Sequence, residues 1–302
     1  MHYVVTGGCG FIGSHLVRGL LHDGHRVTVV DDCSTGSHAA LADGARLIEA
    51  DITTPGVMEN ALHGADGCFH LAAIASVQRC HDHWRRGSEV NVLGTIAVCE
   101  AAVHAGAVPV VFASSAAVYG AAQALPITES TARAPLGPYG LDKCIGEDVA
   151  AMAWKTYRLP SAVLRFFNVY GPGQRSDDAY AGVIRRFMDA ARAGTPVTIY
   201  GDGSQTRDFI FVQDVVRAMR AAMERGMTGH TVYNVCTGHA ISINALAEAI
   251  GEVTGTPLAV RHAEARSGDI RHSLGSPEAL RRAFPLPAPT HLDEGLRALL
   301  SS

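Results

Sequence analysis

The chain has 302 residues, of which 47% are hydrophobic, so it can bury one large core or the cores of two smaller domains. Its 25 basic and 29 acidic residues give a net charge of −4, which provides no broad basic field and argues against nucleic acid as a partner. The seven cysteines are odd in number and form no CxxC pair, a usage typical of reduced thiols in a cytoplasmic protein.

Two stretches bear on membrane association. The sequence begins with the apolar run MHYVVTGG, without a charged leader, so we expect no signal peptide. Residues 105–127 carry no charge, but their glycines, prolines and serines suit a buried strand and a loop better than a membrane span. We therefore expect a cytoplasmic protein with no membrane partner.

The first half of the chain alternates short β-branched runs with helical segments. The strand-like runs are HYVVTGG (2–8), RVTVVDD (26–32), ARLIEADI (45–52), GCFHLAA (67–73) and AVPVVFASS (107–115). Helical segments begin near Ser14 and Asn91. Alternation at this spacing indicates parallel βαβ units, and hence an α/β fold with a doubly wound parallel sheet.

The pattern changes after AVLRFFNVYGP (162–172), where elements shorten and Gly, Asp and Arg become frequent. The later segments 207–224 and 231–238 return to strand–helix–strand order. We therefore expect a second, smaller α/β domain assembled from interleaved segments. Residues 1–166 and 205–238 are assigned to the larger domain, and residues 167–204 and 239–302 to the smaller one.

A glycine-rich turn follows the first strand. In VVTGGCGFIGSHL (4–16) the glycines stand right after a strand and at the start of a helix, the context of a dinucleotide-binding loop. Asp31 ends the second strand, 18 residues after Gly13. A carboxylate there can accept hydrogen bonds from the adenosine ribose and would repel a 2′-phosphate, so the sequence favours NAD over NADP.

The stretch GPYGLDKC (137–144) contains a tyrosine followed four residues later by a lysine. Lysine is rare here, since only Lys143 and Lys155 occur among the 25 basic residues. About 0.05 accidental matches to this pattern are expected in the chain. Tyr139 and Lys143 are therefore a candidate proton-transfer pair.

These motifs together identify a family resemblance. The chain resembles the extended short-chain dehydrogenase/reductases, in particular their NAD-dependent nucleotide-sugar epimerases. The matching motifs run in order over nearly the whole length: TGGCGFIGSH (6–15), DDCSTG (31–36), ADI (50–52), HLAA (70–73), EVNVLGT (89–95), SSAAVYG (114–120), PYGLDK (138–143), RFFNVYGPGQ (165–174), YGDGSQTRDFIFVQDV (200–215) and RSGDIRHSLG (266–275). The resemblance implies a Rossmann domain, a UDP-sugar substrate, and a homodimer formed by the helices that follow Asn91 and contain Tyr139.

The resemblance also implies which residues meet the cofactor. Asp51 and Ile52 are expected to flank the adenine, and the backbone of residues 71–73 to line the ribose and phosphates. The full expected set is Gly7, Gly10, Phe11, Ile12, Gly13, Asp31, Asp32, Ser34, Asp51, Ile52, Leu71, Ala72, Ala73, Asn91, Tyr139, Lys143 and Phe166.

Ser115, Tyr139 and Lys143 match the catalytic residues of the family. The pKa of tyrosine is ordinarily about 10, so the positive charges of Lys143 and oxidised nicotinamide are expected to favour the phenolate. Tyr139 could then take a proton from a sugar hydroxyl while NAD+ accepts hydride from the same carbon. The sequence departs from the family at Asp142, where a serine or alanine is usual; this carboxylate could oppose the charge of Lys143 or point to solvent.

The residues after Ser115 bear on the type of reaction. The family's 4,6-dehydratases carry an acid and a base there, whereas this chain has Ala116 and Ala117. Dehydration is therefore disfavoured, and we expect oxidation to a 4-keto sugar followed by return of the hydride to the opposite face. Other nucleotide-sugar oxidoreductases or dehydratases, and a non-catalytic NAD-binding sensor, are the more distant alternatives.

The substrate residues are expected by resemblance at Ser115, Asn168, Arg175, Tyr200, Arg207, Arg266 and Ser273. Arg207, Arg266 and Asn168 would hold the diphosphate, and Tyr200 would border the uracil. Ser273 takes the place of a tyrosine that closes the hexose pocket, so we expect UDP-N-acetylglucosamine and UDP-N-acetylgalactosamine beside UDP-glucose and UDP-galactose.

Two further patterns bear on the substrate and on metal binding. Arg175 falls where UDP-glucuronate 4-epimerases place a carboxylate-binding arginine, so that activity is the close alternative. His81 and His83 lie in one short segment without a third ligand nearby, and we expect no metal.

Overall fold

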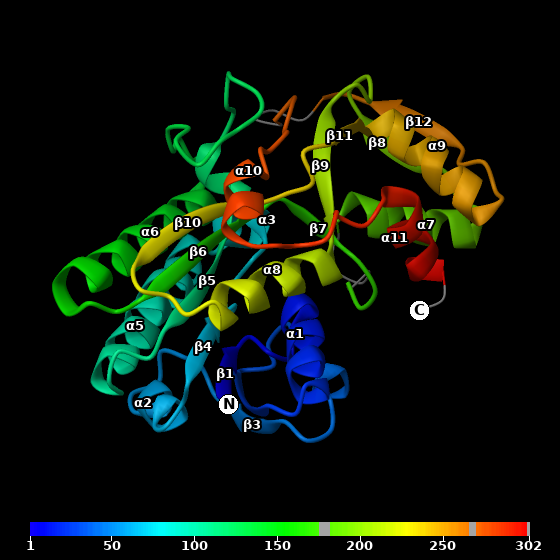
Figure 1. Cartoon of the computed structure of the whole chain (residues 1–302). Coiled ribbons are helices and arrows are strands. Elements are labelled where there is room, and N and C mark those ends of the chain that lie inside the picture. Colours follow the sequence, from blue (N-terminus) through cyan, green and yellow to red (C-terminus); the bar gives the residue numbers. More distant parts are fainter. Residues whose placement is uncertain (175–181, 266–269, 301–302) are drawn as a thin grey trace.

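The computed structural model describes residues 1–174, 182–265 and 270–300. Its larger sheet has seven parallel strands in the order β10-β6-β5-β4-β1-β2-β3 (Figure 1). These strands are β1 (His2–Thr6), β2 (Arg26–Asp31), β3 (Arg46–Glu49), β4 (Gly67–His70), β5 (Val110–Ser115), β6 (Ser161–Phe166) and β10 (His230–Val235). The order confirms the doubly wound parallel sheet of Rossmann type predicted from the sequence.

Helices cover both faces of this sheet. One face packs against α1 (Phe11–His22) and α8 (Val212–Glu224), and the other against α2 (Val57–Leu62), α5 (Gly94–His104) and α6 (Pro138–Tyr157). Adjacent residues of β1 point to opposite faces, so Val5 joins the first core and Val4 the second. Burial on both faces explains why these strands read as continuous apolar runs.

A separate hydrophobic core, distinct from those on the two faces of the large sheet, lies beside that sheet. Shorter strands and three helices pack together there (Figure 1). A three-stranded sheet has the order β11-β9-β7, and β12 pairs with β8. The elements are β7 (Asn168–Tyr170), α7 (Val183–Ala193), β8 (Val197–Tyr200), β9 (Thr206–Phe211), β11 (Ala240–Ser242), α9 (Ile243–Thr254), β12 (Val260–Ala263) and α11 (Leu292–Leu300). The expected smaller, interleaved α/β unit is therefore present.

The residue boundaries between the two units stay a prediction. Strand β9 lies in the range 205–238 assigned to the larger domain, yet it pairs with β7 and β11 of the small sheet. Helix α8 and strand β10, from the same range, pack on the large sheet. The chain thus passes between the units within one short segment.

The short elements lie mainly in loops around the carboxyl ends of the large-sheet strands. They are η1 (His38–Ala40), α3 (Val77–Asp82), α4 (Trp84–Ser88), the π-helical turn η2 (Glu89–Leu93), η3 (Ala116–Tyr119) and α10 (Glu278–Ala283). The strand order reverses between β1 and β4, and ligands of such sheets bind beyond the carboxyl ends at that point. No helix in the described part of the chain is long and apolar enough to cross a membrane.

Candidate active site

The loop between β1 and α1 packs so closely against neighbouring backbone that only glycine fits at two of its positions. A Cβ on Gly13 would lie 2.1 Å from the carbonyl oxygen of Gly7. Gly7 itself has a φ of +72°, and its Cβ would lie 2.7 Å from the backbone nitrogen of Ala72. The N-cap residue Gly10 provides no side-chain cap, so the first amides of α1 stay available to an anion. This cradle fits a dinucleotide pyrophosphate.

Asp31 fastens the glycine loop to the end of β2. Its two carboxylate oxygens accept hydrogen bonds from the backbone N–H groups of Cys9, at 2.9 Å, and Cys33, at 2.8 Å. Burial raises the pKa of Asp31, and these two hydrogen bonds lower it. Asp32 accepts from the backbone and hydroxyl of Ser34 at 3.0 and 2.6 Å, which shapes the turn after the strand.

Asp51, which is expected to flank the adenine, is held by Thr53 and Arg86, two residues that were not predicted to form the cofactor site. Asp51 accepts hydrogen bonds from the backbone and hydroxyl of Thr53, at 2.8 and 2.7 Å, and from Arg86, at 2.6 Å. Ile52 is 3% exposed and packs so closely on the first turn of α5 that a Cβ on Gly94 would lie 2.4 Å from its Cδ1. The Ile52 side chain is therefore packed inward.

The side chains of two other predicted cofactor residues point into the protein interior. Phe166 is 7% exposed and belongs to the core on the α1 and α8 face of the sheet. Asn91 is 3% exposed, and its side chain holds both the N–H (2.8 Å) and the C=O (3.2 Å) of Ile74. Asn91 therefore fixes the end of the loop containing residues 71–74, the loop that lies against Gly7.

The three candidate catalytic residues come together where β5 ends and α6 begins. Ser115 ends β5, Tyr139 stands in the first turn of α6, and Lys143 follows one turn later on the same side. The Ser115 hydroxyl accepts the N–H of Ala117 at 3.1 Å and lies close enough to Tyr139 to lower the pKa of its phenol. The Lys143 ammonium donates to the carbonyl of Ala113 at 2.7 Å and lies 5.9 Å from the centroid of the Tyr139 ring.

Burial, rather than the lysine, dominates the acidity of the tyrosine. It raises the pKa of Tyr139 to about 12, and the neighbouring Ser115 hydroxyl offsets only part of this effect. Burial also lowers the pKa of Lys143 to about 8, opposed by Cys80, Asp142 and Glu147. The expectation that Lys143 helps to make Tyr139 a base at neutral pH therefore requires the additional charge of oxidised nicotinamide.

The position of Asp142 answers a question that the sequence left open. Asp142 is 1% exposed and does not point to solvent. Its carboxylate accepts hydrogen bonds from the hydroxyl of Ser88, at 2.8 Å, and the amide of Asn91, at 3.3 Å. The residue thus ties α6 to α4 and to the π-helical turn η2.

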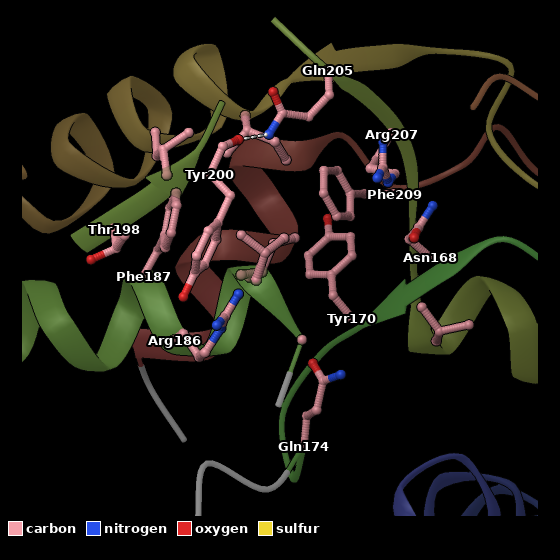
Figure 2. Close-up of a pocket in the computed structure, with 16 residues that line it drawn as sticks. Asn168, Tyr170, Gln174, Arg186, Phe187, Thr198, Tyr200, Gln205, Arg207 and Phe209 are labelled. Carbon is pink, nitrogen blue, oxygen red and sulfur yellow. Dashed lines mark hydrogen bonds between the residues drawn. The ribbon is translucent and has the colours of Figure 1, made fainter. Parts of the chain in front are cut away.

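A pocket of about 410 Å³ opens between the small sheet and α7. Asn168, Tyr200 and Arg207, from β7, β8 and β9, line it as Figure 2 shows. The Asn168 amide donates to the carbonyl of Asp208 at 3.0 Å, and Arg207 donates to that of Thr206 at 2.9 Å. Three predicted substrate residues are therefore brought together.

Sequence reasoning missed several polar and aromatic residues of this pocket. Gln205 donates to the carbonyl of Tyr200 at 2.8 Å, which links the two strands (Figure 2). Its position two residues before Arg207, within the same motif, was the available signal. The other such residues are Tyr170, Gln174, Arg186, Phe187, Thr198 and Phe209.

The remaining substrate predictions are not gathered in this pocket. Arg175 and Arg266 lie outside the described residues. Ser273 is 8% exposed and is not among the described residues that line the pocket. Its N–H donates to the carbonyl of Thr206, the first residue of β9, at 3.1 Å. Ser273 therefore lies against β9, next to the residue before Arg207.

Within the described residues, two groups of three side chains have ligand atoms close enough to share a metal ion. They are Cys9, Asp31 and Cys33, and Cys33, His38 and Glu49. Neither group contains His81 or His83. Asp31 already accepts hydrogen bonds from the backbones of both Cys9 and Cys33.

Comparison with known proteins decides the family. Residues 3–236 match the NAD dependent epimerase/dehydratase family. The chain belongs to this family. A UDP-glucose 4-epimerase of Mycolicibacterium smegmatis is 39% identical, over 90% of this chain and 89% of the relative.

Solved structures of other family members have the same fold. A UDP-N-acetylglucosamine 4-epimerase from Methanobrevibacter ruminantium, in complex with UDP-N-acetylmuramic acid, superposes with a TM-score of 0.95 and 34% identity, over 99% of this chain and 97% of that one. The UDP-glucose 4-epimerase of Thermus thermophilus, in complex with NAD, gives a TM-score of 0.91 and 31% identity, over 100% and 98% of the chains. The protein described here, as a member of this family, uses NAD as its cofactor.

Proposed function

We propose that the protein is a UDP-hexose 4-epimerase that works through a 4-keto intermediate. The observation that carries this proposal is the grouping of Ser115, Tyr139 and Lys143 at the end of β5, close to the strand-order reversal of an NAD-binding sheet. The pocket with Asn168, Tyr200 and Arg207 supports a nucleotide diphosphate substrate, because guanidinium groups pair well with phosphate oxygens.

In this proposal the protein's residues handle the proton. Bound NAD+ supplies a hydride acceptor and, once reduced, a hydride donor. Tyr139 takes the proton of the sugar 4-hydroxyl as the hydride leaves C4, so the carbon–oxygen bond becomes a ketone. Ser115 hydrogen-bonds the reacting oxygen throughout. Once the 4-keto sugar has rotated, it would present the opposite face of C4 to the reduced cofactor, and Tyr139 would return the proton to the oxygen.

The side chains near Ser115 support epimerisation rather than dehydration. Ala116 and Ala117 follow it in η3 and have no group able to protonate a departing hydroxyl. Asp142 and Glu147 on the neighbouring helix are held by other partners, Asp142 by Ser88 and Asn91, and Glu147 by Arg165. Neither is placed as a free acid at the site.

For the sugar, we propose UDP-N-acetylglucosamine and UDP-N-acetylgalactosamine together with UDP-glucose and UDP-galactose. The support is the small side chain at Ser273, beside the strand that carries Arg207. A tyrosine at this position would occupy space that an N-acetyl group needs. The UDP-glucuronate alternative depends on Arg175, which lies outside the described residues.

We also propose that the protein forms a homodimer through α5 and α6. Leu141 and Met152 are 40% and 56% exposed on one face of α6, while Leu93, at the end of η2, and Ile96, in the first turn of α5, are 55% and 39% exposed. The two helices contact each other, so these side chains can form one apolar surface. Met152→Glu should then lower the mass measured by light scattering, whereas Val260→Glu, on an exposed strand of the other unit, should leave it unchanged. A monomeric wild type would refute the dimer.

The function is tested by supplying substrates one at a time. Purified protein with NAD is incubated separately with UDP-glucose, UDP-galactose, their N-acetylated counterparts and UDP-glucuronate, and proton NMR identifies the products. We expect inversion at C4 for the hexose and N-acetylhexosamine pairs. Unchanged sugars, or a 6-deoxy-4-keto product, would overturn the proposal, and inversion of UDP-glucuronate alone would favour the alternative.

A further inference from the structure

Asp142 is a buried carboxylate next to the candidate catalytic lysine, and its hydrogen bonds leave α6. It accepts from Ser88 on α4 and from Asn91 on η2, at 2.8 and 3.3 Å. Burying a charged carboxylate costs free energy unless hydrogen-bond donors compensate for the lost water, and two donors do so here.

The carboxylate selects one orientation of the Asn91 amide. A carboxylate only accepts hydrogen bonds, so it must face the NH2 end of that amide. The oxygen end then faces the other way, where it accepts the N–H of Ile74 at 2.8 Å. A flipped amide would place its oxygen against the carboxylate and its NH2 against the Ile74 N–H, so both contacts would become repulsive.

Ile74 ends the loop that lines the NAD site. Besides the Asn91 contacts, its carbonyl accepts from the thiol of Cys80 at 3.2 Å, so both of its backbone groups are held by side chains. Two residues earlier, Ala72 approaches Gly7 so closely that a Cβ on Gly7 would lie 2.7 Å from the Ala72 nitrogen. A shift at Ile74 would therefore move backbone that lies against the dinucleotide loop.

We propose that Asp142 is a positioning residue that orients the Asn91 amide and thereby holds the 71–74 loop against the NAD site. Its effect on the loop is independent of the reaction, whereas any effect on turnover rests on the proposed epimerase function. A second consequence concerns Lys143, its neighbour in the chain.

The charge of Asp142 also acts on Lys143. The ionisable groups that act on this ammonium are Cys80 from α3 and Asp142 and Glu147 from α6, and His70 from β4 is in turn affected by it. Burial lowers the pKa of Lys143, and the negative charge of Asp142 raises it. Removing that charge should lower the pKa further, so that Lys143 loses its proton at a lower pH.

Two substitutions separate the hydrogen bonds from the charge. In Asp142→Asn, the new amide can donate to the Ser88 hydroxyl and accept from Asn91, so the positioning contacts persist without the charge. Asp142→Ala removes both. Asp148→Asn and Asp148→Ala are the matched controls, because Asp148 lies on the same helix with a side chain that is 64% exposed.

The first readout needs no catalysis. Hydrogen exchange of the Ile74 N–H and the NAD dissociation constant are measured for each variant. Asp142→Ala should speed the exchange and weaken NAD binding about tenfold, the scale expected for losing a hydrogen bond to a charged group. Asp142→Asn and both Asp148 variants should resemble wild type. If Asp142→Ala also leaves the Ile74 exchange and NAD affinity unchanged, the positioning role is wrong.

The second readout is the pH profile of turnover with a UDP-hexose. Asp142→Asn should shift the alkaline limb to lower pH, since Lys143 would lose its proton sooner, and Asp148→Asn should not. An unmoved limb would refute the effect on Lys143. If wild type shows no epimerase activity but Ile74 exchange and NAD binding still respond in Asp142→Ala, the proposed function fails and the positioning role stands.

Discussion

The hydroxyl of Thr6 lies 2.8 Å from Nδ1 of His70, deep between β1 and β4. Thr6 Oγ1 accepts the N–H of Ala72 at 3.1 Å, and it donates its own hydrogen to Nδ1 because the neutral ring carries its proton on Nε2. On the other side of the ring, Thr95 donates to the carbonyl of Asn91 at 2.7 Å and so accepts from Nε2–H, at 3.0 Å. His70 is therefore a neutral link between the loop after β4 and the turn containing Asn91.

The buried position of His70 predicts acid sensitivity. Burial lowers its pKa from the ordinary 6.5 to about 3. The unfolded chain therefore binds more protons than the folded one between these values, so stability present above pH 6.5 is lost as pH falls towards 3. The slope from this group alone approaches about 1.4 kcal/mol per pH unit. Urea unfolding at several pH values measures it; His70→Gln should flatten the slope, and an equal slope in that variant would contradict this assignment.

Tyr139→Phe should abolish most turnover while NAD stays bound. Removing one general acid–base group typically lowers the rate by roughly 100- to 10,000-fold. The phenyl ring keeps the packing of this buried side chain, so NAD affinity and unfolding should change little. Turnover is followed with the UDP-hexose that wild type accepts. A Phe variant with turnover close to wild type would show that another residue takes the proton.

Asp31 should set the choice between NAD and NADP. Its buried carboxylate ends β2, where it would lie close to a 2′-phosphate. Wild type should bind NAD far more tightly than NADP, measured by titration of the purified apoprotein. Asp31→Asn removes the charge and keeps only one of the two oxygens that accept from Cys9 and Cys33, so NADP binding should improve, NAD binding should weaken, and the preference should narrow. Equal binding of both cofactors by wild type would mean that Asp31 does not contact this part of the cofactor.

Ser273→Tyr should shift activity away from N-acetylated sugars. The added ring would compete with the N-acetyl group, and overpacking of about 1–3 kcal/mol corresponds to a roughly 5- to 150-fold fall in kcat/KM for those substrates relative to UDP-glucose. Ser273→Ala is the matched control and should retain both activities. Thermal unfolding of each variant separates this effect from misfolding. An unchanged substrate ratio in the tyrosine variant would remove Ser273 as the determinant.

Local spacing carried much of what the sequence predicted. The glycine loop followed by Asp31, and the tyrosine and lysine four residues apart, depend on where a strand ends and on which side of one helix two residues fall. The strand–helix alternation similarly predicted the doubly wound sheet, since parallel strands need crossover connections. Such features are properties of single segments, so they can be read without knowing what packs against them.

Other features depended on which segments meet. The ion pair of Glu147 with Arg165, at 2.6 Å, joins α6 to β6, and the Ser114 hydroxyl donates to the same carboxylate from β5. Nothing in the spacing of these residues indicates that they share a buried site. The inward packing of Ile52 and Phe166, both expected at the cofactor, has the same origin, because neighbouring helices and sheet faces decide which side of a segment is covered.

The sequence by itself determined the class of sheet, the cofactor and the identity of the catalytic candidates. The tertiary structure decided what surrounds them: Asp142 turned inward to Asn91, Gln205 beside Tyr200, and a tyrosine whose pKa is raised by burial. The physical reason is that hydrogen-bond partners and desolvation are set by contacts between segments far apart in the chain, and those contacts exist only after the chain has folded.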